Sequence, residues 1–387
     1  MQPRRLASDV SLTIAEQTVG SAHEVPRFYL NAEAFAGYRV ERIISTGAVG
    51  AVVTAQHRER GRVAIKLLHP QLRNEPTLQA RLSREAHVLT RLASEHIVRL
   101  LDTGWTDAVG PFVVLEHLDG MDLARMLESQ RPLQASFAVE LVLQACEGLR
   151  VAHRAGITHR DIKPENLFAV HRGPSPLLKL LDFGISHHRP ESFPYRDVVT
   201  NDGEAQLMGT PGYMAPERIL DLPRPDFRSD IWSLGVVLHE LLTAQPLFGR
   251  GDAATTCSRI VRHEFTLEAN RALLPASLRP VIARCLARNP ADRFPDVQEL
   301  ATALVQAMSG TQGRGFLTGK FRLTDAAPGT VAATPPLPVQ EPEHPVLPSQ
   351  RRRWPWLVLA LAVAIFFGIH TLLRLEAQRA ADTGALH

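Results

Sequence analysis

The chain has 387 residues, of which 45% are hydrophobic and 21% are charged, and its formal net charge is only +3. This length and composition suit a globular protein with room for a two-lobed catalytic unit plus appendages, and the small net charge argues against a nucleic-acid-binding protein. The cysteines, Cys146, Cys257 and Cys285, lie far apart and match no zinc-ligand spacing, so we expect buried thiols in a reducing compartment.

The first predicted segments are a tail and a small lobe. Residues 1–37 are polar and show no hydrophobic period, so we expect a disordered tail whose Ser and Thr are either phosphate acceptors or inert. From about residue 38 to 118, short β-type runs alternate with one helical stretch over about 75–92. This pattern predicts a mainly β lobe that carries one helix.

A larger helical lobe is predicted over about residues 119–308, because apolar residues recur there with the helical period. Two of its helices are expected over 137–155 and 230–242. The next segment, 309–353, contains seven prolines, has little apolar periodicity and ends in three arginines. This composition predicts an extended, basic linker.

Residues 354–373 form an apolar run without a charged side chain. At about 1.5 Å per residue, a helix of this length reaches roughly 30 Å, the thickness of a hydrocarbon core. The alternative is a buried soluble helix, but a helix that is apolar on all sides, at the end of a Pro-rich tether, has no core to enter. We therefore expect one transmembrane helix, with the arginine side in the cytoplasm and a short extracytoplasmic tail at 374–387.

Three motifs in the helical lobe have the residues for one reaction. Residues 159–166 place an acid, a base and an amide at the spacing that phosphoryl transfer to a hydroxyl requires, whereas an isolated His-Arg-Asp would be a surface charge cluster. Asp-Phe-Gly begins at 182, 21 residues after Asp161, and Ala-Pro-Glu occupies 215–217. Over roughly residues 38–308 the chain resembles the protein serine/threonine kinase family, in its bacterial, membrane-anchored form. The resemblance implies an α+β fold with a β-rich N-lobe and a larger helical C-lobe.

Residues 44–52 resemble the glycine-rich loop of that family, whose backbone approaches phosphates because no Cβ stands in the way. The first glycine of the family pattern is Ser45 here, while Gly47 and Gly50 remain. Taken alone, such a stretch reads as an ordinary β-hairpin. The resemblance implies that ATP is bound by a loop consisting of Ile44, Ser45, Thr46, Gly47, Ala48, Val49, Gly50 and Val52.

Lys66 lies in an apolar strand, where a lysine is costly to bury unless it is paired. The resemblance implies that its ammonium contacts the α- and β-phosphates of ATP and that Glu85 holds it. Glu75 is the competing acid. Glu85 is favoured because Leu89, one turn further on, supplies an inward apolar contact.

The resemblance also assigns an adenine pocket. Val52 and Ala64 should cover the base from above, and Phe168 should lie below it. The backbone of Glu116 to Leu118 should bond the edge of the base as a hinge, with Leu115 guarding the back of the pocket. Each of the apolar residues in this set reads equally well as part of the core.

The reaction itself sets three requirements. A hydroxyl nucleophile must be aligned with the γ-phosphorus, its proton must leave, and the spreading negative charge must be offset. The resemblance assigns the first two tasks to Asp161, which accepts or orients the hydroxyl proton, and places Lys163 against the γ-phosphate. Asn166 and Asp182 would bind Mg²⁺, an ion that prefers hard oxygen ligands.

Other residues concern the acceptor and regulation. Lys163 and Thr210 resemble the branch of the family that phosphorylates serine and threonine. The resemblance implies a switch in which Arg160 pairs with a phosphate on the activation segment, residues 182–217. The candidate phosphosites are Thr200 first and Ser192 second. The resemblance also implies two structural contacts, namely an ion pair between Glu217 and Arg293 and hydrogen bonds from Asp230 to the backbone of the catalytic loop.

Together these residues predict a membrane-tethered serine/threonine kinase that uses Mg-ATP, acts on Ser and Thr hydroxyls of protein substrates and autophosphorylates, with a homodimer for autophosphorylation left open. One alternative is a pseudokinase scaffold at the membrane. Loss of Lys66, Asp161 or Asp182 would favour it, but all three are present and only Ser45 speaks for it. The other alternative, a small-molecule phosphotransferase, is disfavoured by Thr210 and the Ala-Pro-Glu motif, which belong to a segment that receives peptide chains.

Overall fold

A computed structural model of the chain describes residues 36–129, 132–173, 175–183, 211–220 and 226–309. All of these belong to one compact unit of the chain. Residues 310–353 of the predicted linker, the apolar run at 354–373, the tail predicted at 374–387 and all but the last two residues of the tail predicted at 1–37 lie outside the described residues, whereas Ser309 is the last residue of a helix. Among the helices within the described ranges, none is both long enough and apolar enough to cross a bilayer.

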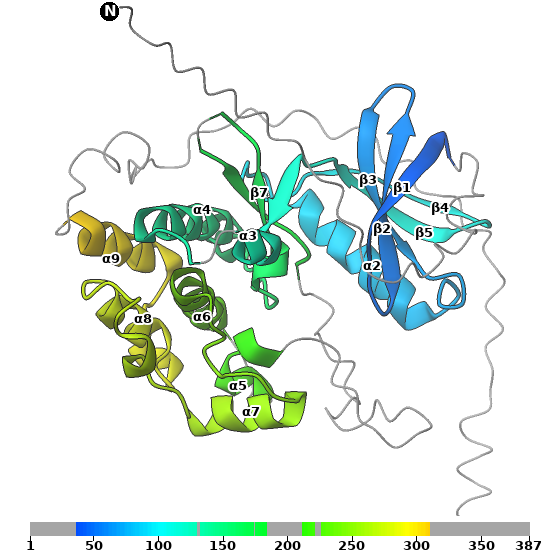
Figure 1. Cartoon of the computed structure of the whole chain (residues 1–387). Coiled ribbons are helices and arrows are strands. Elements are labelled where there is room, and N and C mark those ends of the chain that lie inside the picture. Colours follow the sequence, from blue (N-terminus) through cyan, green and yellow to red (C-terminus); the bar gives the residue numbers. More distant parts are fainter. Residues whose placement is uncertain (1–35, 130–131, 174, 184–210, 221–225, 310–387) are drawn as a thin grey trace, which may run out of the picture. The chain divides into compact units, whose positions relative to one another are not determined.

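Five antiparallel strands form the N-terminal sheet, in the order β1-β2-β3-β5-β4 (Figure 1). They are β1 (Tyr38–Thr46), β2 (Gly50–His57), β3 (Gly61–Leu68), β4 (Leu100–Thr106) and β5 (Gly110–Glu116). Successive side chains of a strand point to opposite faces. In β3, Val63 and Ile65 enter a small core on one face, while Ala64 and Leu68 join a larger core on the other. The alternation therefore places Lys66 on the face of the larger core.

Helix α2 (Pro76–Thr90) packs against β4 and β5 and covers that face (Figure 1). It starts with a proline, whose missing N–H costs nothing at the first turn of a helix. Its buried side chains recur at three- and four-residue spacing, as an inward face requires, and they are Leu82, Glu85, Ala86 and Leu89. Glu75, the competing acid, only precedes the helix as its N-cap residue. The helical period thus turns Glu85 toward the strand that carries Lys66.

The C-terminal part of the described chain is helical and includes a three-stranded antiparallel sheet, in the order β6-β7-β8. Its strands are β6 (Gly120–Asp122), β7 (Leu167–Val170) and β8 (Leu177–Leu180). Its helices are α3 (Leu123–Ser129), α4 (Ala135–Arg154), α5 (Pro216–Ile219), α6 (Arg228–Thr243), α7 (Ala253–Arg262), α8 (Arg279–Cys285) and α9 (Val297–Ser309). The helices predicted over 137–155 and 230–242 are α4 and α6. The β-rich and helical parts give the α+β, two-lobed fold that the sequence predicts.

Helix α6 lies at the centre of the helical lobe and packs against α4 and α8 (Figure 1). Fourteen of its 16 residues are buried, so nearly its whole circumference is covered by other elements. The helix starts where the Asp226 side chain accepts the backbone N–H of Arg228 at 2.9 Å. It ends at Thr243, because the next residue, Ala244, has a φ of 53° and so leaves the helical region. Asp230, in the first turn, is consequently buried.

A buried ion pair joins three segments of this lobe. Arg293 Nη1 and Nη2 donate to Glu217 Oε1 and Oε2 at 2.7 and 2.8 Å, and the two side chains are 0% and 6% exposed. Arg293 also donates to the backbone oxygens of Ala287 and Arg228, each at 2.9 Å. The pair confirms the predicted contact. It fixes α5 against the start of α6 and the segment before α9, because a buried guanidinium needs acceptors on several sides.

Arg293→Met should lower the free energy of unfolding by about 3–5 kcal/mol, because it leaves the Glu217 carboxylate buried without its partner. The matched control is Arg271→Met. Arg271 pairs with Glu268 at 2.9 Å, but both side chains are about two-thirds exposed, so its loss should cost less than about 1 kcal/mol. Urea unfolding of both variants measures the difference, and equal losses would contradict the special position of Arg293.

Candidate functional site

Lys66 lies between two carboxylates that come from different lobes. Its Nζ donates to Glu85 Oε1 and Oε2 at 2.8 and 3.0 Å, and to Asp182 Oδ1 at 2.8 Å. The contact with Glu85 is the one that the sequence predicts. Glu85 is 10% exposed and Asp182 is 46% exposed. One ammonium therefore joins β3, α2 and the segment that follows β8.

The charges of these three groups depend on each other. Burial alone would lower the pKa of Lys66, but the Asp182 and Glu85 carboxylates outweigh burial and raise that pKa. Burial raises the pKa of Glu85 to about 7, and the Lys66 ammonium offsets this only in part. Burial would also raise the pKa of Asp182, but Lys66 lowers it below its ordinary value. Lys66 therefore keeps its positive charge at neutral pH, as a group that binds anions must.

A second cluster lies in the loop between α4 and β7, and it consists of Asp161, Lys163 and Asn166. Lys163 Nζ donates to Asp161 Oδ2 at 2.9 Å. Asn166 Nδ2 donates to the same carboxylate oxygen and to the backbone oxygen of Asp161, both at 2.7 Å. The Asp161 side chain is still 33% exposed. Its carboxylate is thus oriented by two donors and open to solvent, which suits a group that receives a proton from an incoming hydroxyl.

Asp230 holds the backbone of this loop from inside the helical lobe. Its Oδ2 and Oδ1 accept the backbone N–H groups of His159 and Arg160, each at 2.9 Å, which confirms the predicted hold. His153 Nε2 lies 2.8 Å from the same Oδ2. Burial would raise the pKa of Asp230, but the bond from His153 lowers it. Arg160 has a φ of 69°, an uncommon conformation for a side chain of its size, and the carboxylate supplies the bond that holds it.

The two clusters are connected through the end of β8. The Leu181 N–H donates to the backbone oxygen of Asn166 at 2.9 Å, and the Leu181 oxygen lies 2.9 Å from His159 Nε2. Because a carbonyl can only accept, Nε2 must carry the proton. The His159 ring also contacts the buried ring of Phe183, with centroids 4.5 Å apart. Asp182 stands between these two anchored neighbours, so its carboxylate is held next to the catalytic loop.

The predicted phosphate-binding loop is the hairpin between β1 and β2, closed by a bond from the Gly47 N–H to the Gly50 oxygen at 2.8 Å. A Cβ at Gly50 would lie 2.0 Å from the backbone oxygen of Leu67, so the close approach of β2 to β3 requires glycine there. A Cβ at Gly47 would meet nothing closer than 3.8 Å. Ser45 is paired with Val52 in the β1–β2 ladder. The remaining predicted loop residues lie in or beside the same hairpin, and they are Ile44, Thr46, Ala48 and Val49.

Strand register brings several predicted adenine residues to one face of the N-terminal sheet. Val52 is paired with Lys66, and Ala64 is paired with Leu115. Directly paired residues share a face, and Ala64 and Lys66 are two residues apart on one strand, so all four lie on the same side. The remaining predicted residues lie on other segments, with Glu116 at the end of β5, Leu118 just after it and Phe168 on β7.

The predicted switch falls largely outside the described residues. Arg160 itself is partly buried, and burial lowers its pKa. Its backbone oxygen accepts a hydrogen bond from Arg218 Nη1, on α5. Thr200, Ser192 and Thr210 lie outside the described residues. The pairing of Arg160 with a phosphate stays a prediction.

Asn166 and Asp182 are suited to hold a magnesium ion. Both partners of the Asn166 amide nitrogen are oxygens, so that nitrogen must face them and the amide oxygen is turned toward other partners. Asp182 contacts Lys66 through Oδ1, and its side chain is nearly half exposed. An amide oxygen and a carboxylate are the hard donors that Mg²⁺ takes, usually together with waters and phosphates. The donor set therefore fits the ion.

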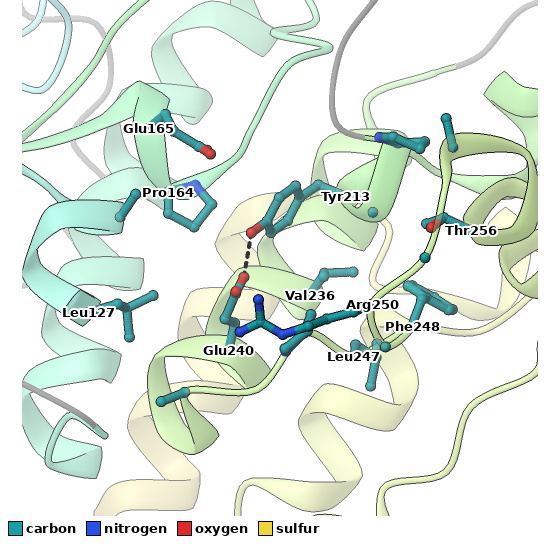
Figure 2. Close-up of a pocket in the computed structure, with 18 of the residues that line it drawn as sticks. Leu127, Pro164, Glu165, Tyr213, Val236, Glu240, Leu247, Phe248, Arg250 and Thr256 are labelled. Atoms are coloured by element: carbon teal, nitrogen blue, oxygen red, sulfur yellow. Dashed lines mark hydrogen bonds between the residues drawn. The ribbon is translucent and has the colours of Figure 1, made fainter. Parts of the chain in front are cut away.

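A pocket of about 640 Å³ lies beside the catalytic loop (Figure 2), and none of the predicted adenine residues lines it. Pro164 and Glu165 of that loop line one part of it, and Tyr213 and Glu240 line another. Figure 2 shows the Tyr213 hydroxyl directed at the Glu240 carboxylate, to which it donates a hydrogen bond. Burial raises the pKa of both groups. The sequence predictions do not include this pair, because no motif or spacing connects the two residues.

Two further contacts at the site are also absent from the sequence predictions. His69 Nε2 lies 2.7 Å from the backbone oxygen of Gly47, at the tip of the hairpin. Lys179 Nζ donates to Glu116 Oε1 at 2.8 Å, at the start of the predicted hinge. A signal for Lys179 was present, because it is a lysine within the apolar run 177–181. The same feature, a lysine in an apolar strand, is what pointed to Lys66.

Comparison with known proteins agrees with this geometry. The family model described as "Protein kinase domain" matches residues 38–306. Among solved structures, the kinase domain of PknI from Mycobacterium tuberculosis is similar, with a TM-score of 0.55 and 27% identity. That alignment covers 71% of this chain and 97% of the PknI domain.

Several curated bacterial proteins are similar in sequence. Serine/threonine-protein kinase Pkn1 of Myxococcus xanthus is 36% identical over 275 residues, which are 70% of this chain and 38% of Pkn1. PknE of M. tuberculosis is 33% identical over 83% of this chain and 53% of its own length. PknB of the same species is 31% identical over 79% of this chain and 49% of its own. The chain thus spans about half or less of the length of each of these relatives.

The two loop glycines should respond differently to alanine. Gly50→Ala should lower the free energy of unfolding by about 1–3 kcal/mol, because its methyl group collides with backbone that cannot move aside. Gly47→Ala should change that free energy by less than about 0.5 kcal/mol and should instead weaken binding of Mg-ATP. Urea unfolding and nucleotide titration of the two variants test this, and equal destabilisation by both would contradict it.

Proposed function

The chain belongs to the protein kinase family, and on that premise we propose that it is a serine/threonine protein kinase, which transfers the γ-phosphate of ATP to Ser and Thr hydroxyls of proteins. The observation that carries the proposal is the bonded network that links Lys66 and Asp182 with the loop of Asp161. The acceptor class is supported by the names of the relatives, which are serine/threonine-protein kinases.

Each charged residue of the network has a task in this reaction. Asp161 is oriented by Lys163 and Asn166. It would take or direct the proton of the acceptor hydroxyl while the hydroxyl oxygen attacks the γ-phosphorus of ATP. Lys163 would offset the charge that develops on the transferred phosphoryl group. Lys66, which stays charged and is aimed by Glu85, would bind the α- and β-phosphates. The chain's own contribution is thus positioning and charge.

The proposed cofactor is Mg²⁺, held by Asn166 and Asp182. When bound, this ion supplies positive charge that offsets the phosphate oxygens. Asp182 is available for it because Lys66 lowers the pKa of this carboxyl, which is therefore ionised at neutral pH. Asn166 has its amide oriented by Asp161, so its oxygen does not need to reorganise to accept the ion.

Regulation by phosphorylation belongs to the same proposal. Arg160 would pair with a phosphate on Thr200, or on Ser192, and so order the activation segment. This support comes from the sequence and from the anchored backbone of Arg160, which Asp230 holds in place. Autophosphorylation between two copies in a homodimer would supply that phosphate.

Two rival functions have less support. A pseudokinase scaffold would tolerate loss of the Lys66–Glu85 pair or of Asp182, yet these side chains are present and bonded to one another. A small-molecule phosphotransferase would have no use for the 215–217 motif, whose Glu217 is tied to Arg293. Ser45, the one mark for a scaffold, lies in a paired strand, where the ladder accepts a side chain.

We also propose that residues 354–373 anchor the kinase to a membrane as a single transmembrane helix, with the catalytic lobes in the cytoplasm. The support is the composition of the chain alone. An uncharged apolar run follows three arginines, and its first three residues include two tryptophans. The Pro-rich linker before it would let the catalytic lobes reach substrates near the bilayer.

Asp161→Asn should lower phosphate transfer by about a hundredfold to ten-thousandfold, because an amide cannot accept the proton. Radiolabel transfer from ATP measures the activity, and far-UV circular dichroism shows whether the variant is folded. The matched control is Asp107→Asn, an exposed residue in the turn between β4 and β5, which should keep full activity. Equal label in wild type and Asp161→Asn would contradict the proposed role. Phosphosite mapping of the labelled wild type would at the same time identify the acceptor residues and test Thr200.

Deleting residues 354–387 should release the protein from the membrane fraction and leave its kinase activity intact, because the catalytic residues all precede the run. The matched control is deletion of residues 1–35, which leaves the apolar run in place and should stay in the membrane fraction. Fractionation followed by an activity assay measures both properties. If the C-terminal deletion partitions like the full-length chain, the anchor is elsewhere or absent.

A further inference from the structure

Lys179 is a buried cation that the reaction described above does not use. It lies in the middle of β8 and is 8% exposed. In the β7–β8 ladder it is paired with Phe168, the predicted floor of the adenine pocket. Directly paired residues of antiparallel strands share a face of their sheet. The Lys179 side chain therefore leaves the sheet on the same side as Phe168, beside the place where a purine would lie.

The ammonium of Lys179 reaches the hinge. Its Nζ donates to Glu116 Oε1 at 2.8 Å, with the two side chains 10% and 20% exposed, and lies 3.4 Å from the backbone oxygen of Ile97. The same Glu116 oxygen accepts the backbone N–H of Arg99 at 2.8 Å, and the Glu116 N–H donates to the Arg99 oxygen at 3.0 Å. The Glu116 side chain and backbone are thus both bonded, and the first hinge residue has little freedom to shift.

The other end of this connection leads to the phosphate side of the site. Three residues after Lys179, the chain reaches Asp182, which bonds Lys66. β8 is also fastened beside the hinge, because the Val98 N–H donates to the Leu180 oxygen at 3.0 Å. One ion pair therefore connects the segment that should bond the adenine edge with the strand that ends two residues before the proposed metal ligand Asp182.

We propose that Lys179 is a positioning residue of the nucleotide site, which acts through Glu116 to hold the hinge backbone at the height of the adenine floor. This role rests on the proposed kinase function, since it concerns the affinity for ATP. The ion pair sets the distance between the hinge and Phe168, and with it the space in which the base is held. A preorganised hinge spares the nucleotide the cost of ordering it.

A purely structural ion pair is the competing explanation. Removing one partner of a buried pair destabilises a protein because the other charge is left uncompensated, whatever the pair does for a ligand. Removing both partners together takes away that penalty. The double variant still lacks the ion pair that connects β8 with the hinge. The two explanations therefore differ in what the double variant does to nucleotide affinity.

The test compares three variants of the full-length chain, namely Lys179→Met, the double variant Lys179→Met with Glu116→Gln, and the control Arg172→Met. Arg172 also forms an ion pair, with Glu95 at 2.7 Å, but that pair is about 60% exposed. The probe is the non-hydrolysable analogue AMPPNP with Mg²⁺, titrated by calorimetry, and thermal melting reports stability. Phosphate transfer at varied ATP gives KM and kcat.

Lys179→Met should raise the Kd for Mg-AMPPNP and the KM for ATP about tenfold. The kcat should change less than about twofold, because the contact between the hinge and the adenine is equally strong in the ground state and the transition state. The double variant should regain most of the melting temperature and keep the raised Kd. Arg172→Met should match the wild type in every measurement. If Lys179→Met is too unstable to assay, the double variant decides by itself.

An unchanged Kd in a folded Lys179→Met variant would overturn the role, as would a double variant that recovers wild-type affinity along with its stability. The proposed kinase function fails separately. A wild-type chain that binds Mg-AMPPNP without transferring phosphate would refute catalysis, and the comparison of Kd values would still decide the role of Lys179. A wild-type chain that binds no nucleotide would refute both.

Discussion

The pairing of one partly buried ammonium is the constraint on which the described site depends. Lys66 is turned by strand alternation toward an apolar core, where a lone cation would be too costly to keep. It must therefore be met by carboxylates, and Glu85 and Asp182 meet it from a helix and from the end of a strand in the other lobe. The position of α2, the end of β8 and the charge state of the site all follow from that requirement.

The helical lobe contains two further buried charges that are bonded to partners at defined positions. Asp230 is buried and accepts backbone N–H groups of the catalytic loop, and Arg293 is buried and binds Glu217 together with backbone oxygens. In each case a charge is placed where water cannot solvate it, so that its only stable partners are groups at defined places. Buried charge here specifies geometry, and the surrounding apolar packing supplies the free energy of folding.

Hydrophobic patterns predict the β-rich and helical lobes, and the helical period favours Glu85 over Glu75, whereas the Lys66–Glu85 contact itself and the bonds from Asp230 to the catalytic loop are predictions from the resemblance to protein kinases. Strand alternation and the helical period decide which face a residue occupies, and both can be counted along the sequence. The Lys179–Glu116 pair joins residues 63 positions apart, and it depends on which strands of two sheets lie next to each other. The Tyr213–Glu240 bond has the same character. Periodicity contains no information about such pairings, so only the folded arrangement reveals them.

The hairpin between β1 and β2 has a consequence for how related chains are judged. Its glycines serve two separate purposes: position 50 is demanded by the neighbouring strand, while position 47 is free of that demand. Ser45 is paired with Val52 in the ladder and its side chain is exposed, so this position has room for a side chain. Counting how many glycines such a hairpin retains is therefore a poor way to sort active transferases from silent ones. What matters is which glycine positions have a neighbouring strand or a bound ligand too close to leave room for a Cβ.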